Sequence, residues 1–268
     1  MKLLCWNVRG MGGIRRSRTF RDLKDFILVH KPEVVFLIEM KMISYQMGEL
    51  KTGSGMEGIL CVPRNDENGG ASGGLCLLWL VGIGVSFISS SFFYIDVLVK
   101  WEDGLDCRLT GFYGEPVARQ RHLSWELLKQ LAVEREGPWL CCGDFNEILS
   151  VSEKIGPALR SQCQIDDFRR TVEECGLYEF AFTVYEFTWD NRREGVTNVK
   201  ARIDRGFGNL ALIQKWGGFT IHHLVTIASD HCPLLIESDS PFNGNGGRVL
   251  GKRRFMFEEM WTTEVECG

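Results

Sequence analysis

The sequence predicts one α/β domain in which mixed β-sheets pack against each other and helices cover the outside. Two observations lead to this fold class. Short apolar runs typical of buried strands alternate with segments whose apolar residues have helical spacing. A hairpin signal in the middle of the chain argues against a purely parallel sheet. The chain has 268 residues, of which 44% are hydrophobic, so it can bury a sizeable core.

The N-terminal segment predicts a strand, a helix and a second strand. Residues 3–6 form an apolar run, and apolar side chains recur at helical spacing over residues 20–27. Lys31-Pro32 ends this helix, because the residue before a proline disfavours helical geometry. Residues 34–38 form the second apolar run.

The middle of the chain predicts a hairpin. Residues 95–99 and 108–113 are strand-like runs, and Glu102-Asp103-Gly104 lies between them. The glycine-rich segment 69–74 precedes a strand instead of joining a strand to a helix. We therefore interpret it as a loop and not as a nucleotide-binding motif.

The second half predicts two more helices, over residues 125–131 and 165–175, which end at Gly137-Pro138 and at Gly176. Apolar runs at 139–142 and 224–228 predict buried strands.

We expect the folded domain to span residues 1–237. The remainder, 238–268, begins with a segment rich in Ser, Asn, Gly and Pro. We interpret it as a linker and a short tail, the start of a missing downstream region.

Charge bounds the way in which the chain could bind nucleic acid. A formal net charge of -4 argues against broad attachment to phosphates, so local basic surface would have to bind them. Two clusters qualify: Arg15, Arg16, Arg18 and Arg21, and Arg192, Arg193, Lys200, Arg202 and Arg205. A solvated helix face or loop explains either cluster equally well.

Ten cysteines have no regular spacing, which favours a reducing compartment over a disulfide framework. Cys5, Cys76, Cys141 and Cys142 lie in apolar runs, where free cysteine packs as a small hydrophobe. We expect no signal peptide, because an apolar strand-like run follows directly after Met1-Lys2, and no apolar run is long enough to span a bilayer. We expect a soluble monomer in the nucleus or cytoplasm, with no membrane partner.

Polar side chains follow the apolar runs at four places in the chain: Asn7, Glu39, Asp144 with Asn146, and Asp230 with His231. A carboxylate at Glu39 is costly to bury unless a cation or hydrogen bonds compensate it. We therefore predict Glu39 as a metal ligand, with Asn7 and Asp230 supplying further oxygens. Such ligands favour Mg²⁺ or Mn²⁺, whereas zinc would require a cluster of His and Cys.

The expected chemistry is hydrolysis of a phosphodiester. Asp204 would orient His231 and keep it protonated near neutral pH, and a cationic imidazole suits the non-bridging oxygens of a phosphate. Asp144 would orient and deprotonate the attacking water, and Asn146 would position Asp144 or the phosphate. The metal would stabilise the departing oxygen.

Each of these residues alone also has a structural explanation. Asp144 and Asn146 could cap their own turn, Asn7 a loop, and His231 could be a hydrogen-bonded residue before a proline turn. Phe187-Thr188-Trp189 fits a core strand as well as a substrate contact. The joint occurrence of the set after strand-like runs favours an active site.

These residues lie in motifs that resemble those of the endonuclease/exonuclease/phosphatase superfamily, whose fold is the four-layer sandwich of deoxyribonuclease I. The resemblance runs from Lys2 to about Leu235, and it is closest to the endonuclease of plant LINE-type non-LTR retrotransposons. The motifs that carry it are Cys5-Trp6-Asn7-Val8-Arg9-Gly10, Phe36-Leu37-Ile38-Glu39, Gly111-Phe112-Tyr113-Gly114-Glu115-Pro116, Gly143-Asp144-Phe145-Asn146-Glu147, Ser152-Glu153-Lys154, Phe187-Thr188-Trp189, Ile203-Asp204-Arg205 and Ser229-Asp230-His231-Cys232-Pro233-Leu234.

The resemblance implies a role for each matching residue. Glu39 binds the divalent metal with Asn7 nearby, Asp144 and Asn146 handle the nucleophilic water, Asp204 and Asp230 flank His231, and Tyr113 and Thr188 contact the phosphate or sugar. Trp189 and Arg205, beside them in the motifs, are expected to bind substrate.

The resemblance alone implies DNA as the substrate, nicking of one strand as the reaction, and target-primed insertion as the setting. DNA-repair members usually carry an acidic or amide residue two places after the first Asn, whereas Arg9 stands here, which disfavours abasic-site repair. A reverse transcriptase would have to be encoded separately or lost. Two other functions remain: a phosphoesterase acting on a small or lipid-linked phosphate, and a non-catalytic retroelement remnant.

Overall fold

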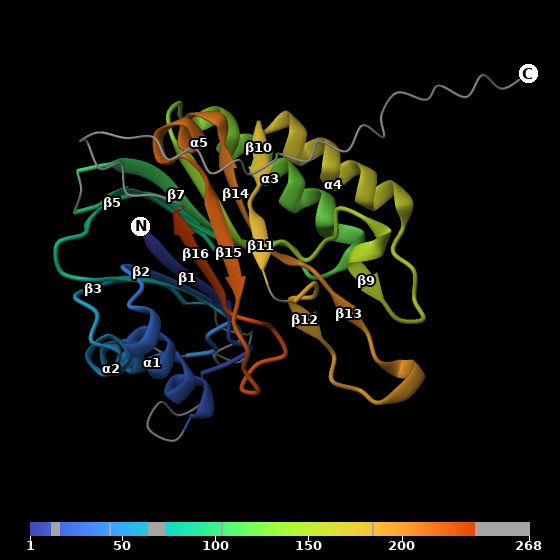
Figure 1. Ribbon diagram of the computed structural model, residues 1–268, viewed down its shortest axis with the longest axis horizontal. Coiled ribbons are helices and arrows are strands. Elements are labelled where there is room, and N and C mark those ends of the chain that lie inside the picture. Colours follow the sequence, from blue (N-terminus) through green and yellow to red (C-terminus); the bar gives the residue numbers. More distant parts are fainter. Residues whose placement is uncertain (12–16, 43, 64–72, 103, 184, 239–268) are drawn as a thin grey trace, which may run out of the picture.

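The computed structural model describes residues 1–11, 17–42, 44–63, 73–102, 104–183 and 185–238. The expected tail beyond Ser238, most of the glycine-rich segment and Asp103 of the hairpin turn lie outside the described residues. Two large sheets pack together, and helices cover their outer faces (Figure 1). The predicted four-layer α/β sandwich is confirmed.

The first sheet has seven strands and carries the N-terminal strand at its centre. Its order is β11 (Ala181–Thr183), β15 (Phe219–His223), β16 (Leu234–Ser238), β1 (Lys2–Asn7), β2 (Val34–Ile38), β4 (Leu75–Trp79) and β3 (Gly58–Val62). β1 runs parallel to β2 and antiparallel to β16.

The second sheet has six strands and contains the predicted hairpin. Its order is β10 (Leu177–Glu179), β14 (Asp204–Asn209), β8 (Trp139–Asp144), β7 (Asp106–Tyr113), β6 (Tyr94–Lys100) and β5 (Gly84–Ser91). β6 and β7 form the hairpin, and β7 pairs with β8 in parallel. A small third sheet joins β12 (Trp189–Asp190), β13 (Lys200–Ala201) and β9 (Lys154–Ile155).

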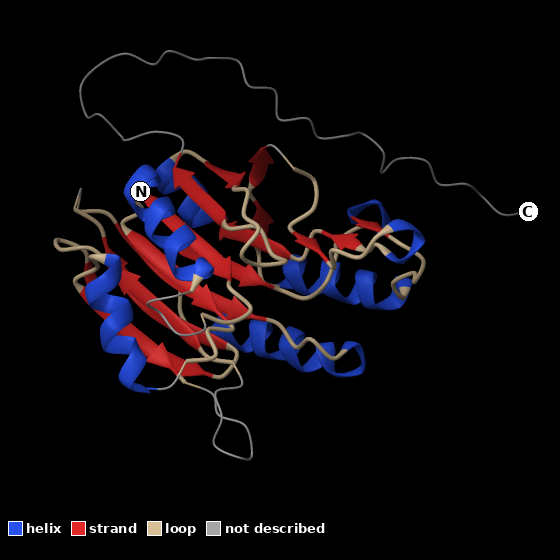
Figure 2. Ribbon diagram, turned by 90° about the horizontal axis from the view of Figure 1, so that it is seen from below, coloured by secondary structure: helices blue, strands red, loops and turns tan. Residues whose placement is uncertain are grey.

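The helices lie where the apolar spacing predicts them: α1 (Arg18–His30), α3 (Arg121–Glu134) and α4 (Gln162–Glu174), with α2 (Ser44–Ser54) and the short α5 (Leu210–Trp216) in addition. Ser17 caps α1 by accepting a hydrogen bond from the Phe20 N–H, and Lys31 in the left-handed region ends it before the proline. Helix α1 covers the seven-stranded sheet, and α3 and α4 cover the six-stranded sheet. Figure 2 shows helices on both outer sides of the packed strands.

Alternating side chains of the central strands build the layers. In β1, Leu3 and Cys5 point into the core between the two sheets, whereas Leu4 and Trp6 point into the core under α1. Strand β8 divides in the same way, with Leu140 in the core between the sheets. A strand that is buried on both faces reads as a continuous apolar run, which is why the sequence revealed these strands so clearly.

The predicted strand at 224–228 is wrong. The ladder between β15 and β16 ends at His223, because Pro233 stands opposite Leu224 and has no N–H to extend it. The segment becomes a loop in which the side chains of Val225 and Ile227 are 63% and 60% exposed. This loop, and not a strand end, carries Asp230 and His231.

The expectation for one cysteine is also wrong. Cys61 and Cys76 face each other across β3 and β4, and the structure joins them in a disulfide. Cys76 is therefore not a free thiol, whereas Cys5, Cys141 and Cys142 are free and buried as expected. None of the helices that the structure describes has the length and apolar composition that crossing a bilayer requires.

Candidate active site

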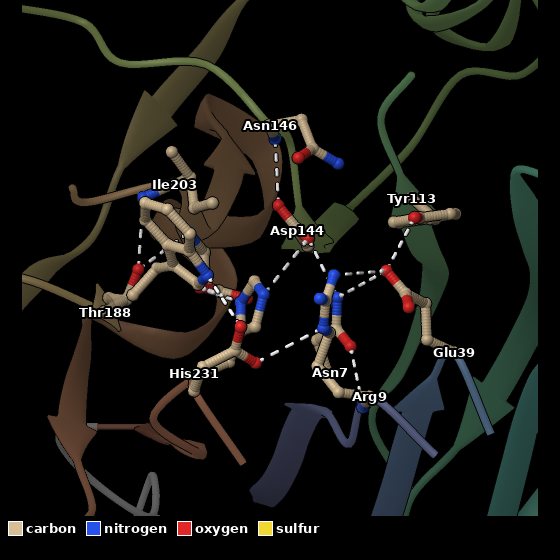
Figure 3. A network of polar contacts seen from close by, with 12 residues as sticks. Asn7, Arg9, Glu39, Tyr113, Asp144, Asn146, Thr188, Ile203 and His231 are labelled. Atoms are coloured by element: carbon tan, nitrogen blue, oxygen red, sulfur yellow. Dashed lines mark hydrogen bonds and ion pairs between the residues drawn. The ribbon is translucent and has the colours of Figure 1, made fainter. Parts of the chain in front are cut away.

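Strand register brings most of the predicted site residues to one end of the sandwich (Figure 3). Tyr113 pairs with Asp144 across β7 and β8, and Asp144 pairs with Asp204 across β8 and β14, so the three residues form a row in the six-stranded sheet. Asn7 and Glu39 come from the facing sheet, where Asn7 ends β1 and Glu39 follows β2.

Close approach of two strands shapes this row. Gly143 pairs with Phe112 across β8 and β7, and a Cβ atom at Gly143 would collide with the backbone carbonyl of Phe112. Glycine is therefore required directly before Asp144.

A chain of hydrogen bonds joins the two sheets through Asn7. The Tyr113 hydroxyl donates to Glu39 Oε1 at 2.7 Å, and Asn7 Nδ2 lies 3.4 Å from the same oxygen. Asn7 Nδ2 also donates to Asp144 Oδ2 at 2.9 Å. The amide of Asn7 thus bridges two carboxylates, and its oxygen accepts the Arg9 N–H.

His231 completes the chain from the other side. Its Nδ1 lies 2.9 Å from Asp204 Oδ2, and its Nε2 lies 4.0 Å from Asp144 Oδ2. Two residues hold its backbone: Trp6 Nε1 donates to the His231 carbonyl, and the Ser229 hydroxyl accepts the His231 N–H.

Burial and charge set the protonation states of this pair. Burial alone would lower the pKa of His231, but the carboxylates of Asp204, Asp144 and Asp230, with Asp204 contributing most, together outweigh burial and raise this pKa to about 9. Burial, and then the charge of Asp204, raise the pKa of Asp144 to about 7. Near neutral pH the site therefore holds a cationic imidazole beside a carboxylate that is ready to exchange a proton.

Glu39 has a different environment. Burial would raise its pKa, but the hydrogen bond from Tyr113 and the charges of Arg9 and Lys41 outweigh burial and lower the pKa. Burial and the nearby carboxylates raise the pKa of Tyr113, so its hydroxyl stays protonated and donates. Glu39 is thus an ionised carboxylate at the edge of the core.

Two groups of donors could hold a metal ion. Asp144, Asp204 and His231 each offer a ligand atom within 4.8 Å of the others, but a protonated His231 has no lone pair for a metal. Glu39 fits a hard divalent ion better, because its carboxylate is ionised. Asp230 Oδ1 could supply a further oxygen, since it is buried without a hydrogen-bond partner among the described residues.

The loops around the site position its side chains. The Asn146 N–H donates to Asp144 Oδ1 at 2.9 Å, and the side chain of Asn146 donates to the Gly114 carbonyl. Trp189 Nε1 donates to Asp230 Oδ2 at 3.0 Å, so Trp189 orients Asp230. The structure places Asp230 beside Trp189 and Arg9, and not against His231 Nδ1.

Thr188 positions the backbone next to the site. Its side chain is buried, and its hydroxyl oxygen accepts the N–H groups of Ile203 and Asp204 at 3.0 and 2.9 Å. These contacts fix the backbone at Asp204, and contact of Thr188 with substrate stays a prediction.

Arg205 is buried and paired within the protein. Its guanidinium group forms ion pairs with Glu153 and Glu179, and Arg202 joins the same two carboxylates. Its side chain has no exposed surface, so these contacts support the fold, and substrate binding by Arg205 stays a prediction.

DNA binding by the two expected basic clusters stays a prediction, and the structure shows contacts for some of their members. Arg15 and Arg16 lie outside the described residues. Arg192 donates to the carbonyl groups of Ile227 and Ser229, which holds the His231 loop. Lys200 lies 3.3 Å from Asp190.

A cavity of about 590 Å³ lies beside His231. Tyr185, Phe187 and Trp189 contribute aromatic walls, and Lys200 lines it as well. Its position next to the imidazole makes it part of the candidate active site.

Sequence reasoning missed three residues that shape the site: Trp6, Lys41 and Ser229. Trp6 and Ser229 stand in the motifs beside Asn7 and Asp230, so their position was a usable signal. Lys41 gave none, since a single lysine after a strand is ordinary.

The sequence matches a known protein family over most of the described residues. A model of the endonuclease/exonuclease/phosphatase family matches residues 4–231. The chain belongs to this family. No curated protein sequence matches it.

Solved structures of this family have the same fold. The endonuclease domain of TRAS1, a telomere-specific non-LTR retrotransposon, is 14% identical, with 89% of this chain and 98% of that chain covered and a TM-score of 0.62. A 3'-5' exonuclease from Neisseria meningitidis is 15% identical over 90% and 100% of the two chains, with a TM-score of 0.62. An AP endonuclease from Leishmania major is 17% identical over 88% and 86%, also with a TM-score of 0.62.

Proposed function

We propose that this chain is a divalent-metal-dependent phosphodiesterase that nicks DNA, an endonuclease domain of retroelement origin. One observation carries the proposal: contacts run without a break from Glu39 through Asn7 and Asp144 to His231 and Asp204. A metal-binding carboxylate, a base and a cation for the phosphate are thereby held in one place.

The residues divide the reaction between them. Asp144 accepts a proton from the attacking water, for which a pKa of about 7 is well matched to neutral pH. Imidazolium at His231 neutralises the charge that develops on the phosphate oxygens. Glu39, held by Tyr113, would bind Mg²⁺ or Mn²⁺, which would stabilise the departing oxygen. Asn7 and Asn146 hold the base in place.

DNA as the substrate and a retroelement as the source are supported by the motifs around Asn7, Tyr113 and His231, which resemble those of LINE-type endonucleases. The structural neighbours named as an endonuclease domain and an exonuclease agree with nuclease chemistry on this fold.

Nicking of supercoiled plasmid with Mg²⁺ tests the proposal. We expect the wild type to convert the plasmid to the open-circular form, and Asp144→Ala and His231→Ala to be reduced by at least about a hundredfold. A plasmid left intact by the wild type would contradict the proposal.

A second function is favoured by the cavity beside His231, whose aromatic walls would suit a small organic phosphate. An intact plasmid together with turnover of a soluble phosphomonoester would favour this activity. A non-catalytic remnant would be favoured if calorimetry found no Mg²⁺ binding to the wild type or to Glu39→Ala.

A further inference from the structure

Arg9 bridges two carboxylates at the rim of the site. Its Nη1 lies 3.8 Å from Glu39 Oε1, and its Nε lies 3.4 Å from Asp230 Oδ1. Figure 3 shows it beside Asn7, on the side of Glu39. Arg9 therefore contacts Glu39 and Asp230, the two carboxylates whose oxygens could coordinate a hard divalent cation.

The backbone builds this placement. Val8 N–H donates to the Ile38 carbonyl and Met11 N–H to the Met40 carbonyl, so the loop after β1 is tied to the loop after β2. Arg9 and Glu39 both have left-handed backbone, with φ of 53° and 54°. Such strain in residues other than glycine is uncommon and gathers at functional sites. The fold therefore fixes the backbone of Arg9 beside Glu39, within reach of its side chain.

The ion pairs themselves are loose. Charge-assisted hydrogen bonds have lengths of about 2.7–2.9 Å, and both contacts of Arg9 are longer. The arginine side chain is 50% exposed, and Asp230 Oδ1 accepts no hydrogen bond from any described residue. A divalent ion that coordinates these oxygens directly would interact more strongly than Arg9 does, and it would repel the guanidinium group.

We propose that Arg9 is an exchangeable counter-ion of the metal site: it neutralises Glu39 and Asp230 in the metal-free protein, and it moves to a phosphate of the nucleic acid when a divalent ion binds. This inference rests on the proposed function. A guanidinium group released at the rim of a phosphodiesterase site has a bidentate partner in a backbone phosphate. Metal and DNA would then favour each other's binding. The metal frees Arg9 from Glu39 and Asp230 to contact a phosphate, and the phosphate holds the positive charge of Arg9 away from the metal.

Binding of Mn²⁺ without DNA tests the first half. Free Mn²⁺ is measured by electron paramagnetic resonance during titration of the wild type, of Arg9→Gln and of a matched control, Arg170→Gln. Arg170 is an exposed arginine on α4 that pairs with Asp167 at 3.2 Å, so its substitution changes the net charge equally. We expect Arg9→Gln to bind Mn²⁺ about tenfold more tightly than the wild type, and Arg170→Gln to match the wild type. Equal or weaker binding by Arg9→Gln overturns the inference.

Binding of Mn²⁺ with DNA tests the second half. The same titration is repeated without and with saturating duplex DNA in a His231→Ala background, in which we expect cutting to be at least about a hundredfold slower. We expect the Mn²⁺ affinities of the proteins with Arg9 and with Arg9→Gln to differ by no more than about twofold when DNA is present, because the phosphates now hold the arginine. A tenfold difference in Mn²⁺ affinity that persists with DNA overturns the proposed movement of Arg9 to a phosphate. Absence of Mn²⁺ binding to both wild type and Arg9→Gln would remove the metal site altogether, so failure of the proposed function gives a different result from failure of this inference alone.

Discussion

Asp204→Asn tests whether the charge of His231 is what the site uses. The carboxylate of Asp204 holds the pKa of His231 at about 9 against an ordinary value of 6.5, although burial acts in the opposite direction. A difference of that size corresponds to roughly 3 kcal/mol in favour of the imidazolium. With asparagine at this position burial prevails, and the ring is neutral at mildly alkaline pH.

The loss can be estimated from the chemistry. Removing one preorganised group that stabilises transition-state charge costs about 10²–10³-fold in rate, and we expect a loss of that order for Asp204→Asn at mildly alkaline pH. The assay is the initial rate of plasmid nicking as a function of pH. The wild type should rise near pH 7 as Asp144 ionises and fall near pH 9 as His231 loses its proton. In Asp204→Asn the falling limb should move to lower pH.

A matched control separates this effect from a general loss of structure. Glu237 lies 3.3 Å from His222 at a distance from the site, so Glu237→Gln removes a carboxylate from beside a histidine without touching the catalytic pair. Its pH profile should match that of the wild type. An Asp204→Asn protein that keeps the wild-type falling limb would refute the reasoning.

Three further outcomes follow from the same contacts. Tyr113→Phe removes the donor to Glu39 and should weaken Mn²⁺ binding about tenfold in a titration followed by electron paramagnetic resonance; unchanged binding would count against the metal position. In the metal-free protein, the raised pKa of Asp144 contributes stability that is lost as pH rises through about 7. The raised pKa of His231 contributes stability that is complete below pH 6.5 and lost as pH rises through about 9. The midpoint of thermal unfolding should therefore fall, and not rise, between pH 6.5 and about 9. Arg205→Met leaves the half-buried carboxylates of Glu153 and Glu179 with Arg202 as their remaining arginine partner, and it should lower the free energy of unfolding by roughly 1–3 kcal/mol in urea denaturation; a cost below about 0.5 kcal/mol would show that the ion pairs of Arg205 matter little.

The sequence by itself determined the elements whose signals are local. Apolar spacing fixed helices α1, α3 and α4 and the central strands β1, β2 and β8, because a buried face imposes its period on neighbouring residues. It also indicated Asn7, Glu39 and Asp144, since polar groups that end apolar runs are conspicuous wherever the rest of the strand is buried, whereas the run before His231 is a loop.

Only the tertiary structure decided which groups those side chains meet. Because Pro233 lies opposite Leu224, the apolar run after β15 forms a loop and not a strand. Arg205 is buried in ion pairs with Glu153 and Glu179, which come from two distant segments. Arg9 acquired its position because two loops far apart in the sequence are tied together by backbone hydrogen bonds. Pairing across strands and between charges depends on the register of segments that are remote in the chain, and no period within one segment records that register.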